Sequence, residues 1–102
     1  MPIPGPYFRF TDDEITGNAP DAAGVYALED VGDVIYYGSS TDSVRGRLQA
    51  HKNGDEGACT QNAGWFRTEL NSSPRARERQ LLQEYQREHG RLPKCNSVIP
   101  QP

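Results

Sequence analysis

Short runs of β-branched and aromatic residues alternate with longer amphipathic stretches along this chain. Three short runs bounded by turn residues predict β-strands at residues 24–28, 34–38 and 65–70. Two longer stretches with apolar residues every three or four positions predict helices at residues 43–52 and 74–89. The predicted fold class is therefore α/β of the α+β type, with elements in the order strand, strand, helix, strand, helix.

The first two predicted strands are separated by a short loop with a turn glycine, which predicts a β-hairpin. If Leu28 pairs with Val34, Tyr26 lies directly opposite Tyr36, with both phenols on one face of the sheet. A slip of one residue would place the two phenols on opposite faces.

The chain of 102 residues predicts one domain, with a core at residues 20–97, an irregular lead-in at residues 1–19 and a tail at residues 98–102. The lead-in is rich in proline, and its acidic stretch predicts one short helical turn. Residues 58–62 fit either a short helix or a loop. Three aromatic residues of the lead-in are expected to pack onto the body: Tyr7, Phe8 and Phe10.

The inward faces of both predicted helices carry charged or titratable groups. The apolar stripe that begins at Val44 also holds Arg47 and His51, and the stripe that ends at Tyr85 begins with Glu78. Burying an unpaired charge costs several kcal/mol, so these groups need partners. Each alone has a structural explanation, such as an arginine that extends to solvent or a hydrogen-bonded core histidine. Together they are expected to meet near the face that carries the two tyrosines.

Basic and acidic residues are segregated along the chain, although the formal net charge is only −3. Residues 1–43 have a net charge of −7, and residues 44–102 have a net charge of +4. A basic carboxy-terminal half can supply a positive face for phosphates. Uneven charge also occurs in domains that bind no nucleic acid, so the charge alone leaves both interpretations open.

The two cysteines, Cys59 and Cys95, are far apart in the sequence, and neither has a second Cys or a His at the spacing of a metal site. The amino terminus lacks the features of a cleavable signal, and no apolar run approaches the ~20 residues that span a bilayer. The sequence therefore predicts a reduced, cytoplasmic protein that does not insert into membranes.

Phosphodiester hydrolysis needs the types of group that the two helices and the hairpin provide. Negative charge spreads over the phosphate oxygens in the transition state, and the planar fork of donors on Arg47 can match that charge. The carboxylate of Glu78 can hold a hard divalent cation such as Mg²⁺, which keeps several waters and completes its shell with the phosphate. Water must then be oriented or deprotonated, for which Tyr26, Tyr36 and His51 are candidates.

Five motifs in this order resemble the GIY-YIG endonuclease family, the small catalytic module of homing endonucleases, some restriction enzymes and bacterial excision-repair nucleases. The two signatures are Gly24-Val25-Tyr26 and Tyr36-Tyr37-Gly38, the second with tyrosine where isoleucine is commonest. The other three are Arg47-x-x-x-His51, the segment that begins at Glu78, and Pro93-x-x-Asn96. The resemblance covers residues 20–97.

The resemblance implies a central three-stranded antiparallel sheet flanked by helices. It also implies a metal-dependent endonuclease that acts on duplex or branched DNA, in DNA repair or as part of a mobile element. A partner protein is expected to supply specificity, because the sequence has no separate DNA-binding domain.

Roles for single residues also follow from the resemblance. Arg47 would stabilise the scissile phosphate, and Glu78 would bind a single Mg²⁺ ion, with Mn²⁺ as a substitute. Tyr26 and Tyr36 would position or deprotonate the attacking water, and His51 would act as a base, proton relay or phosphate ligand. Supporting roles would fall to residues that shape the site: Gly24, Gly38 and Asn96.

Two features inside the motifs depart from the family pattern. The turn between Gly38 and Arg47 is one residue longer than is common, which makes Arg45 a second candidate for the phosphate ligand. Arg47 is preferred because it lies one helical turn before His51. Residues 86–92 are additional and lengthen the connection to the last motif.

Two other functions fit parts of the pattern. A non-catalytic module of the same fold would bind DNA or RNA through the bases Arg45, Arg47, Lys52, Arg67, Arg75, Arg77 and Arg79. A protein-interaction domain would use the aromatic residues Tyr7, Phe8, Phe10 and Trp65. A nuclease is favoured, because a silent module has no need of a buried arginine and glutamate. In the nuclease, DNA contacts beyond the scissile phosphate would come from Arg45, Lys52, Arg67, Arg75 and Arg79.

Overall fold

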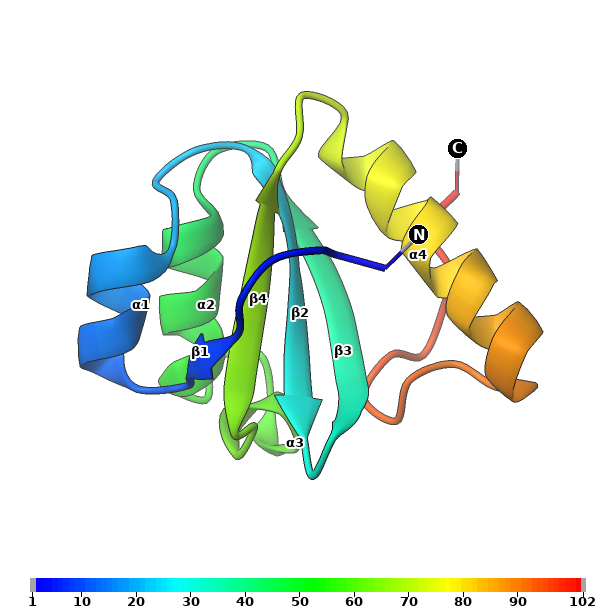
Figure 1. The fold of residues 1–102 in the computed structure, drawn as a ribbon, viewed down its shortest axis with the longest axis horizontal. Helices are drawn as coiled ribbons and strands as arrows, with labels where there is room; N and C mark the ends of the chain where they lie inside the picture. The colour runs from blue at the N-terminus through cyan, green and yellow to red at the C-terminus, as the bar shows by residue number, and fades with distance from the viewer. Residues whose placement is uncertain (1, 102) are drawn as a thin grey trace.

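A four-stranded antiparallel sheet in the order β1-β4-β2-β3 forms the centre of the computed structural model, which describes residues 2–101 (Figure 1). The elements follow the chain as β1 (Phe8–Arg9), α1 (Asp12–Asn18), β2 (Gly24–Asp30), β3 (Asp33–Ser40), α2 (Val44–Lys52), α3 (Ala58–Gln61), β4 (Trp65–Leu70) and α4 (Pro74–His89). The predicted α+β class is therefore confirmed, and so are the third predicted strand and the bounds of α4, whereas α2 begins one residue later than predicted.

Helices cover both faces of this sheet. Helices α1 and α2 pack on one face and α4 packs on the other, as Figure 1 shows. The core is accordingly divided in two: Tyr26 and Leu48 belong to the cluster under α1 and α2, and Val25 and Leu82 belong to the cluster under α4. Successive strand residues point to opposite faces, so β2 contributes to both clusters.

The hairpin differs from its predicted register. Tyr26 pairs with Gly38 and Leu28 pairs with Tyr36, and a bulge follows between Leu28 and Glu29. The prediction that Tyr26 faces Tyr36 directly is wrong, because both strands extend further into the loop and the bulge adds a residue. The shift is an even number of residues, so both phenols still share one face, with ring centroids 6.2 Å apart.

The lead-in at residues 1–19 was predicted to be irregular apart from one short helical turn, and it contains that helix and also a strand. Strand β1 adds a fourth strand by pairing with β4, and α1 begins after Thr11, whose side chain accepts a hydrogen bond from the Glu14 amide. Phe10 and Ile15 are buried in the core cluster. A strand of two residues has too few positions to show alternation, so the three-stranded prediction missed it.

The two cysteines form a disulfide, with their Cα atoms 5.8 Å apart. The prediction of two reduced thiols is wrong, because spacing in the sequence does not report which segments the fold brings together. The bond joins α3 to the segment after α4, and it removes the support that the cysteines gave to a reducing compartment. Within residues 2–101, no helix has the length and apolarity needed to span a membrane.

Candidate active site

A cavity of about 570 Å³ opens at the β3 edge of the sheet. Tyr36 reaches it from β3, Arg47 from α2 and Glu78 from α4. Its other lining residues are Ser39, Ser40, Thr41, Asp42, Arg75, Val98 and Pro100. Because α2 and α4 cover opposite faces, an edge strand is the place where side chains from both helices can meet. Three residues far apart in the sequence therefore line one cavity.

A buried hydrogen-bonded row lies behind this cavity. Tyr26 Oη lies 2.8 Å from His51 Nε2, and His51 Nδ1 lies 2.8 Å from Thr60 Oγ1. Tyr26, His51 and Thr60 are all buried, and the Tyr36 ring packs edge-on against the His51 ring with centroids 4.9 Å apart. Thr60 was not among the predicted site residues, because the short stretch that carries it could not be assigned to a helix or a loop.

Burial keeps the histidine and both phenols uncharged. Desolvation lowers the pKa of His51 to about 4, with Glu56 opposing the shift and Arg47 adding to it. Desolvation raises the pKa of Tyr26 and of Tyr36, and the nearby Arg47 opposes both shifts. At neutral pH the imidazole is therefore an uncharged acceptor, and each phenol keeps its proton unless a further positive charge enters the site.

Arg47 is the main positive charge beside the phenols. One terminal nitrogen pairs with Glu56 Oε1 at 3.1 Å, and the buried Nε has no hydrogen-bond partner among the described residues. An unsatisfied buried donor costs about 1–3 kcal/mol, so this guanidinium favours an incoming acceptor. The competing candidate Arg45 instead donates from Nε to the Ala19 carbonyl, as part of the connection to α1.

Glu78 presents a half-buried carboxylate to the same cavity. Its Oε1 accepts a hydrogen bond from Ser39 Oγ at 2.5 Å, whereas the residues at 2–101 offer no hydrogen bond to Oε2. Burial raises the pKa of Glu78, and the hydrogen bond from Ser39 and the charges of Arg75 and Arg47 oppose that shift.

The donor set at Glu78 fits Mg²⁺ better than a metal held wholly by protein. The described part of the chain contains no group of three or more His, Cys, Asp or Glu side chains that could hold a metal ion. Mg²⁺ is bound through one or two carboxylates and keeps several waters, so one carboxylate facing a wide cavity meets its needs. Zinc, with three or four protein ligands, does not fit this arrangement.

Two signature glycines leave room for neighbouring strands and rings. A Cβ at Gly24 would lie 2.3 Å from the carbonyl oxygen of Glu69 on β4, which is backbone and has no freedom to move aside. A Cβ at Gly38 would lie 2.4 Å from Cζ and Oη of Tyr26. Gly38 therefore makes the space in which the Tyr26 phenol reaches His51.

Asn96 fixes the strand that carries Tyr36. Its side chain accepts from the Tyr37 amide at 2.9 Å and donates to the Tyr37 carbonyl at 3.0 Å, closing a two-point contact with β3. The additional residues at 86–92 extend α4 and the following turn, and they leave Asn96 in contact with β3.

The sequence matches the family described as the GIY-YIG catalytic domain over residues 22–91, which is more than half of the chain. This chain belongs to the GIY-YIG family. The resemblance to this family that the sequence motifs indicated is thereby confirmed.

Two solved structures similar to this GIY-YIG domain are of the N-terminal endonuclease domain of UvrC from Thermotoga maritima. One, bound to its catalytic divalent cation magnesium, is 24% identical, with a TM-score of 0.65 over 83% of this chain and 93% of that chain. The other, a point mutant bound to its catalytic divalent cation, is 22% identical, with the same TM-score and coverage. At this identity the likeness establishes the fold. A comparison with curated protein sequences finds no match.

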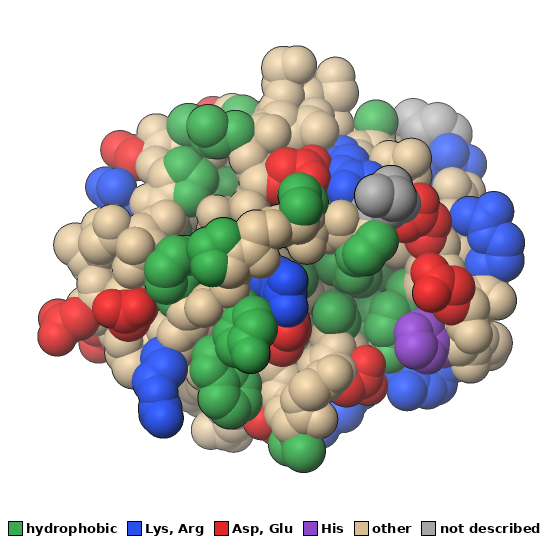
Figure 2. All heavy atoms as spheres, in the orientation of Figure 1, with side chains coloured by type: hydrophobic (Ala, Val, Ile, Leu, Met, Phe, Trp, Pro, Cys, Tyr) green, Lys and Arg blue, Asp and Glu red, His purple; other side chains and the backbone are tan. Residues whose placement is uncertain are grey.

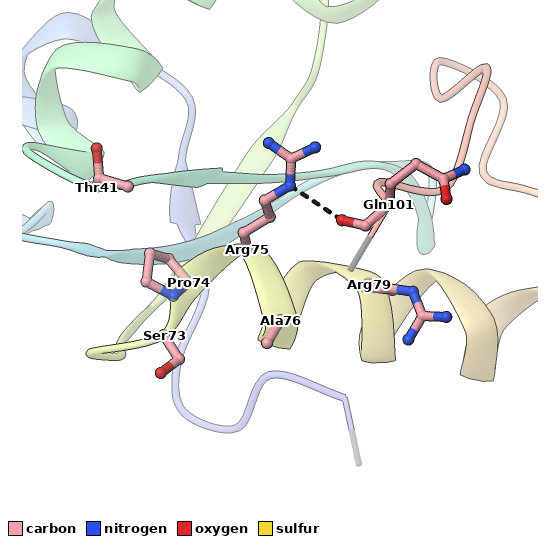
Figure 3. A pocket seen from close by; sticks show the side chains of 7 residues that line it. All are labelled: Thr41, Ser73, Pro74, Arg75, Ala76, Arg79 and Gln101. Carbon is pink, nitrogen blue, oxygen red and sulfur yellow. Dashed lines mark hydrogen bonds between the residues drawn. The ribbon is translucent and has the colours of Figure 1, made fainter.

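Two of the basic residues predicted to bind DNA around this GIY-YIG site lie at the cavity or next to it. Arg75 lines it, and Arg79 lines a second cavity of about 340 Å³ that shares Thr41 and Arg75 with the first. Figure 3 shows Arg75 directed to the Gln101 carbonyl, to which its Nε donates at 3.2 Å. The two cavities therefore adjoin at Thr41 and Arg75, near the amino-terminal end of α4.

Other basic residues predicted to contact DNA interact with groups of the protein itself. Arg67 pairs with Glu29 at 2.6 Å, and the Lys52 ammonium lies 5.4 Å from the centre of the Phe10 ring. On the face shown in Figure 2, basic and acidic side chains are interspersed on the α4 side. The basic carboxy-terminal half thus does not make that face uniformly positive.

The aromatic residues proposed for a protein-interaction surface do not form one. Phe10 is buried, and Phe8 packs against Phe66 in the core. Tyr7 is exposed and contacts the half-buried Trp65 edge-on. Most of this aromatic group therefore holds the lead-in against β4.

Proposed function

We propose that this GIY-YIG domain is a divalent-metal-dependent endonuclease that hydrolyses phosphodiester bonds in DNA. The observation that carries the proposal is the single cavity lined by Tyr36, Arg47 and Glu78, which combines a phenol, a guanidinium and a carboxylate. Each of these groups answers a separate need of phosphodiester hydrolysis, and they come from three different elements.

In this proposal Glu78 holds Mg²⁺, or Mn²⁺ in its place, through the carboxylate that faces the cavity. The bound cation would polarise the P–O bond and stabilise the leaving oxygen. The Arg47 guanidinium donates to a phosphate oxygen as negative charge develops there. Tyr36 orients the attacking water from the cavity wall, and the row of Tyr26 and His51 behind it holds the phenols and Arg47 in place.

The substrate class we propose is branched or duplex DNA, in DNA repair or in a mobile element. Arg75 and Arg79 support DNA binding beyond the scissile phosphate, because both basic side chains line adjoining cavities. The other basic side chains mostly interact with groups of the protein itself, which supports a partner protein as the source of target specificity. Cytoplasmic localisation stays a prediction, and the disulfide between Cys59 and Cys95 does not support it.

Cleavage of linear, nicked and branched DNA with Mg²⁺ or Mn²⁺ tests the proposal. Glu78→Gln should lower the rate at least about 10²-fold, the size seen when one preorganised electrostatic group is removed. The matched control is Glu88→Gln, an exposed position in the last turn of the same helix, which should cleave like the unmodified protein. Equal rates for the Glu78→Gln and unmodified proteins would rule the proposal out. Salt-sensitive DNA binding without cleavage would instead identify a non-catalytic module of this fold.

A further inference from the structure

The row of Tyr26, His51 and Thr60 has no access to solvent. The relative exposures of these residues are 0%, 1% and 2%, so the hydrogen bonds of the row are made with protein groups. Nothing in the sequence motifs involves Thr60, which makes the end of this row a new element of the site.

Donors and acceptors along the row can be assigned from chemistry. Arg47, beside the Tyr26 oxygen, has only donors, so it cannot accept the phenol proton. Among the described residues, the acceptor within hydrogen-bond distance of Tyr26 Oη is His51 Nε2. The phenol therefore donates to Nε2, which must be the unprotonated nitrogen of a neutral imidazole. The proton of the ring then lies on Nδ1, and the Thr60 hydroxyl accepts it.

From this assignment we propose that Thr60 is a positioning residue that fixes the tautomer of His51 and, through it, the direction of the Tyr26 hydroxyl. All hydrogen bonds of the row then donate in the same direction: Arg47 donates to Tyr26, Tyr26 donates to His51 Nε2, and His51 Nδ1 donates to Thr60. In the other tautomer, Nε2–H would donate to Tyr26, and the phenol proton would be turned toward the donors of Arg47. The role of this polarity in catalysis rests on the proposed nuclease function.

The fold holds Thr60 by a covalent connection as well as by packing. Thr60 lies on α3, a helix of four residues, next to Cys59, which is bonded to Cys95. The Cys95 amide donates to the Ile35 carbonyl at 2.8 Å, one residue before Tyr36 on β3. The hydroxyl that sets the tautomer is thus tied to the strand that carries the second phenol.

Nitrogen-15 NMR of histidine-labelled protein tests the tautomer without metal or DNA. Two-bond couplings distinguish Nδ1–H from Nε2–H, and the exposed His89 is an internal reference. We expect Nδ1–H at His51 in the unmodified protein and in Thr60→Ser, which keeps the hydroxyl. Thr60→Val is isosteric but has no acceptor, so it should shift His51 to Nε2–H. Nε2–H in the unmodified protein, or an unchanged tautomer in folded Thr60→Val, would overturn the proposal.

A cleavage assay then tests the functional consequence. Thr60→Val should lower kcat on the order of 10- to 100-fold, by analogy with removal of the hydrogen-bond partner of a metal-ligating histidine, with little change in KM for DNA. Thr60→Ser should restore most of the rate, and Thr16→Val, the same change at an exposed position on α1, should have no effect. If no protein cleaves DNA, the nuclease proposal fails, whereas the NMR result still decides the role of Thr60 as a tautomer-setting residue.

Discussion

Arg47 and His51 lie one turn apart on α2, but their surroundings give them opposite electrostatic states. The Arg47 side chain is 40% exposed and lines the cavity, so its charge is available to a phosphate. His51 is sealed between Tyr26 and Thr60 and stays neutral. One residue is therefore suited to contact an anionic substrate, and the other to hold a hydrogen-bonded row.

Arg47→Ala should lower DNA cleavage about 10²- to 10³-fold, because it removes a donor aimed at charge that develops in the transition state. The fold should be retained, since the side chain reaches the surface and its ion pair with Glu56 is partly exposed. Single-turnover cleavage and thermal unfolding measure the two effects separately. Arg87→Ala, which removes an exposed arginine from α4, is the control for loss of one charge.

The stability of the protein should decrease as the pH is lowered, because His51 is buried in its neutral form. Its pKa is about 4 in the folded protein and about 6.5 in an unfolded chain, so between these values the unfolded state binds more protons. This contribution is fully present above pH 6.5 and is lost as the pH falls toward 4. The full loss is about 3 kcal/mol.

Urea unfolding at several pH values between 7.5 and 4 measures this effect. His51→Gln should be less stable than the unmodified protein at pH 7 but should show a shallower dependence on pH in this window. His89→Gln removes an exposed imidazole and should keep the original dependence. An unchanged pH slope in His51→Gln would mean that His51 is not the group responsible.

At the scale of the elements, a glycine of the hairpin makes room for a ring of the site. Gly38 of β3 pairs with Tyr26 of β2, and the ring of Tyr26 occupies the space that a side chain at residue 38 would need. The signature glycine and the signature tyrosine are therefore two parts of one packing arrangement across the hairpin.

Gly38→Ala should lower the free energy of unfolding by about 1–3 kcal/mol, the usual cost of overpacking. It should also displace the Tyr26 phenol from His51, which the NMR tautomer assay would detect. Gly17→Ala in α1 is the control, because a Cβ there meets nothing within 4 Å. That change should leave stability equal or raise it by up to about 1 kcal/mol. Equal stability of the Gly38→Ala and unmodified proteins would contradict the packing argument.

Local patterns were sufficient to predict most elements but not their pairing. The bounds of β4 and α4 follow from a short run bounded by turn residues, a proline at the helix start and Gly90 at its end, all of which are local signals. The register of the hairpin depends on a bulge, and β1 depends on β4 as a template. Neither feature leaves a periodic signal in the sequence, so both predictions were incomplete.

At the scale of the whole molecule, the site depends on contacts between distant segments. Motif order in the sequence identified Tyr36, Arg47 and Glu78 as candidates, and the fold brings them to one cavity. Thr60 could not be selected, because its role arises only when α3 packs against α2. The cysteine pair was missed for the same reason, since 36 residues separate two cysteines that no local motif connects.

Reduction of this disulfide should destabilise the whole domain. Closing a loop of 36 residues restricts the unfolded chain, and the loop-entropy relation gives about 4 kcal/mol of stabilisation. The loop closed by the disulfide contains β4 and α4. Loss of the disulfide therefore affects the unfolding of the sheet as well as the position of α3. Urea unfolding with and without dithiothreitol measures the difference, with free thiols titrated to confirm each state.

The variant with both Cys59→Ser and Cys95→Ser separates loss of the cross-link from other effects of the reductant. Its stability should match that of the reduced protein and should not respond to dithiothreitol. Reduction should also weaken the His51–Thr60 contact, because the short α3 then loses its covalent link to the segment that bonds to β3. His51 should therefore exchange between tautomers in the reduced, folded protein. Equal unfolding free energies for the oxidised and reduced proteins would show that packing alone holds α3 in place.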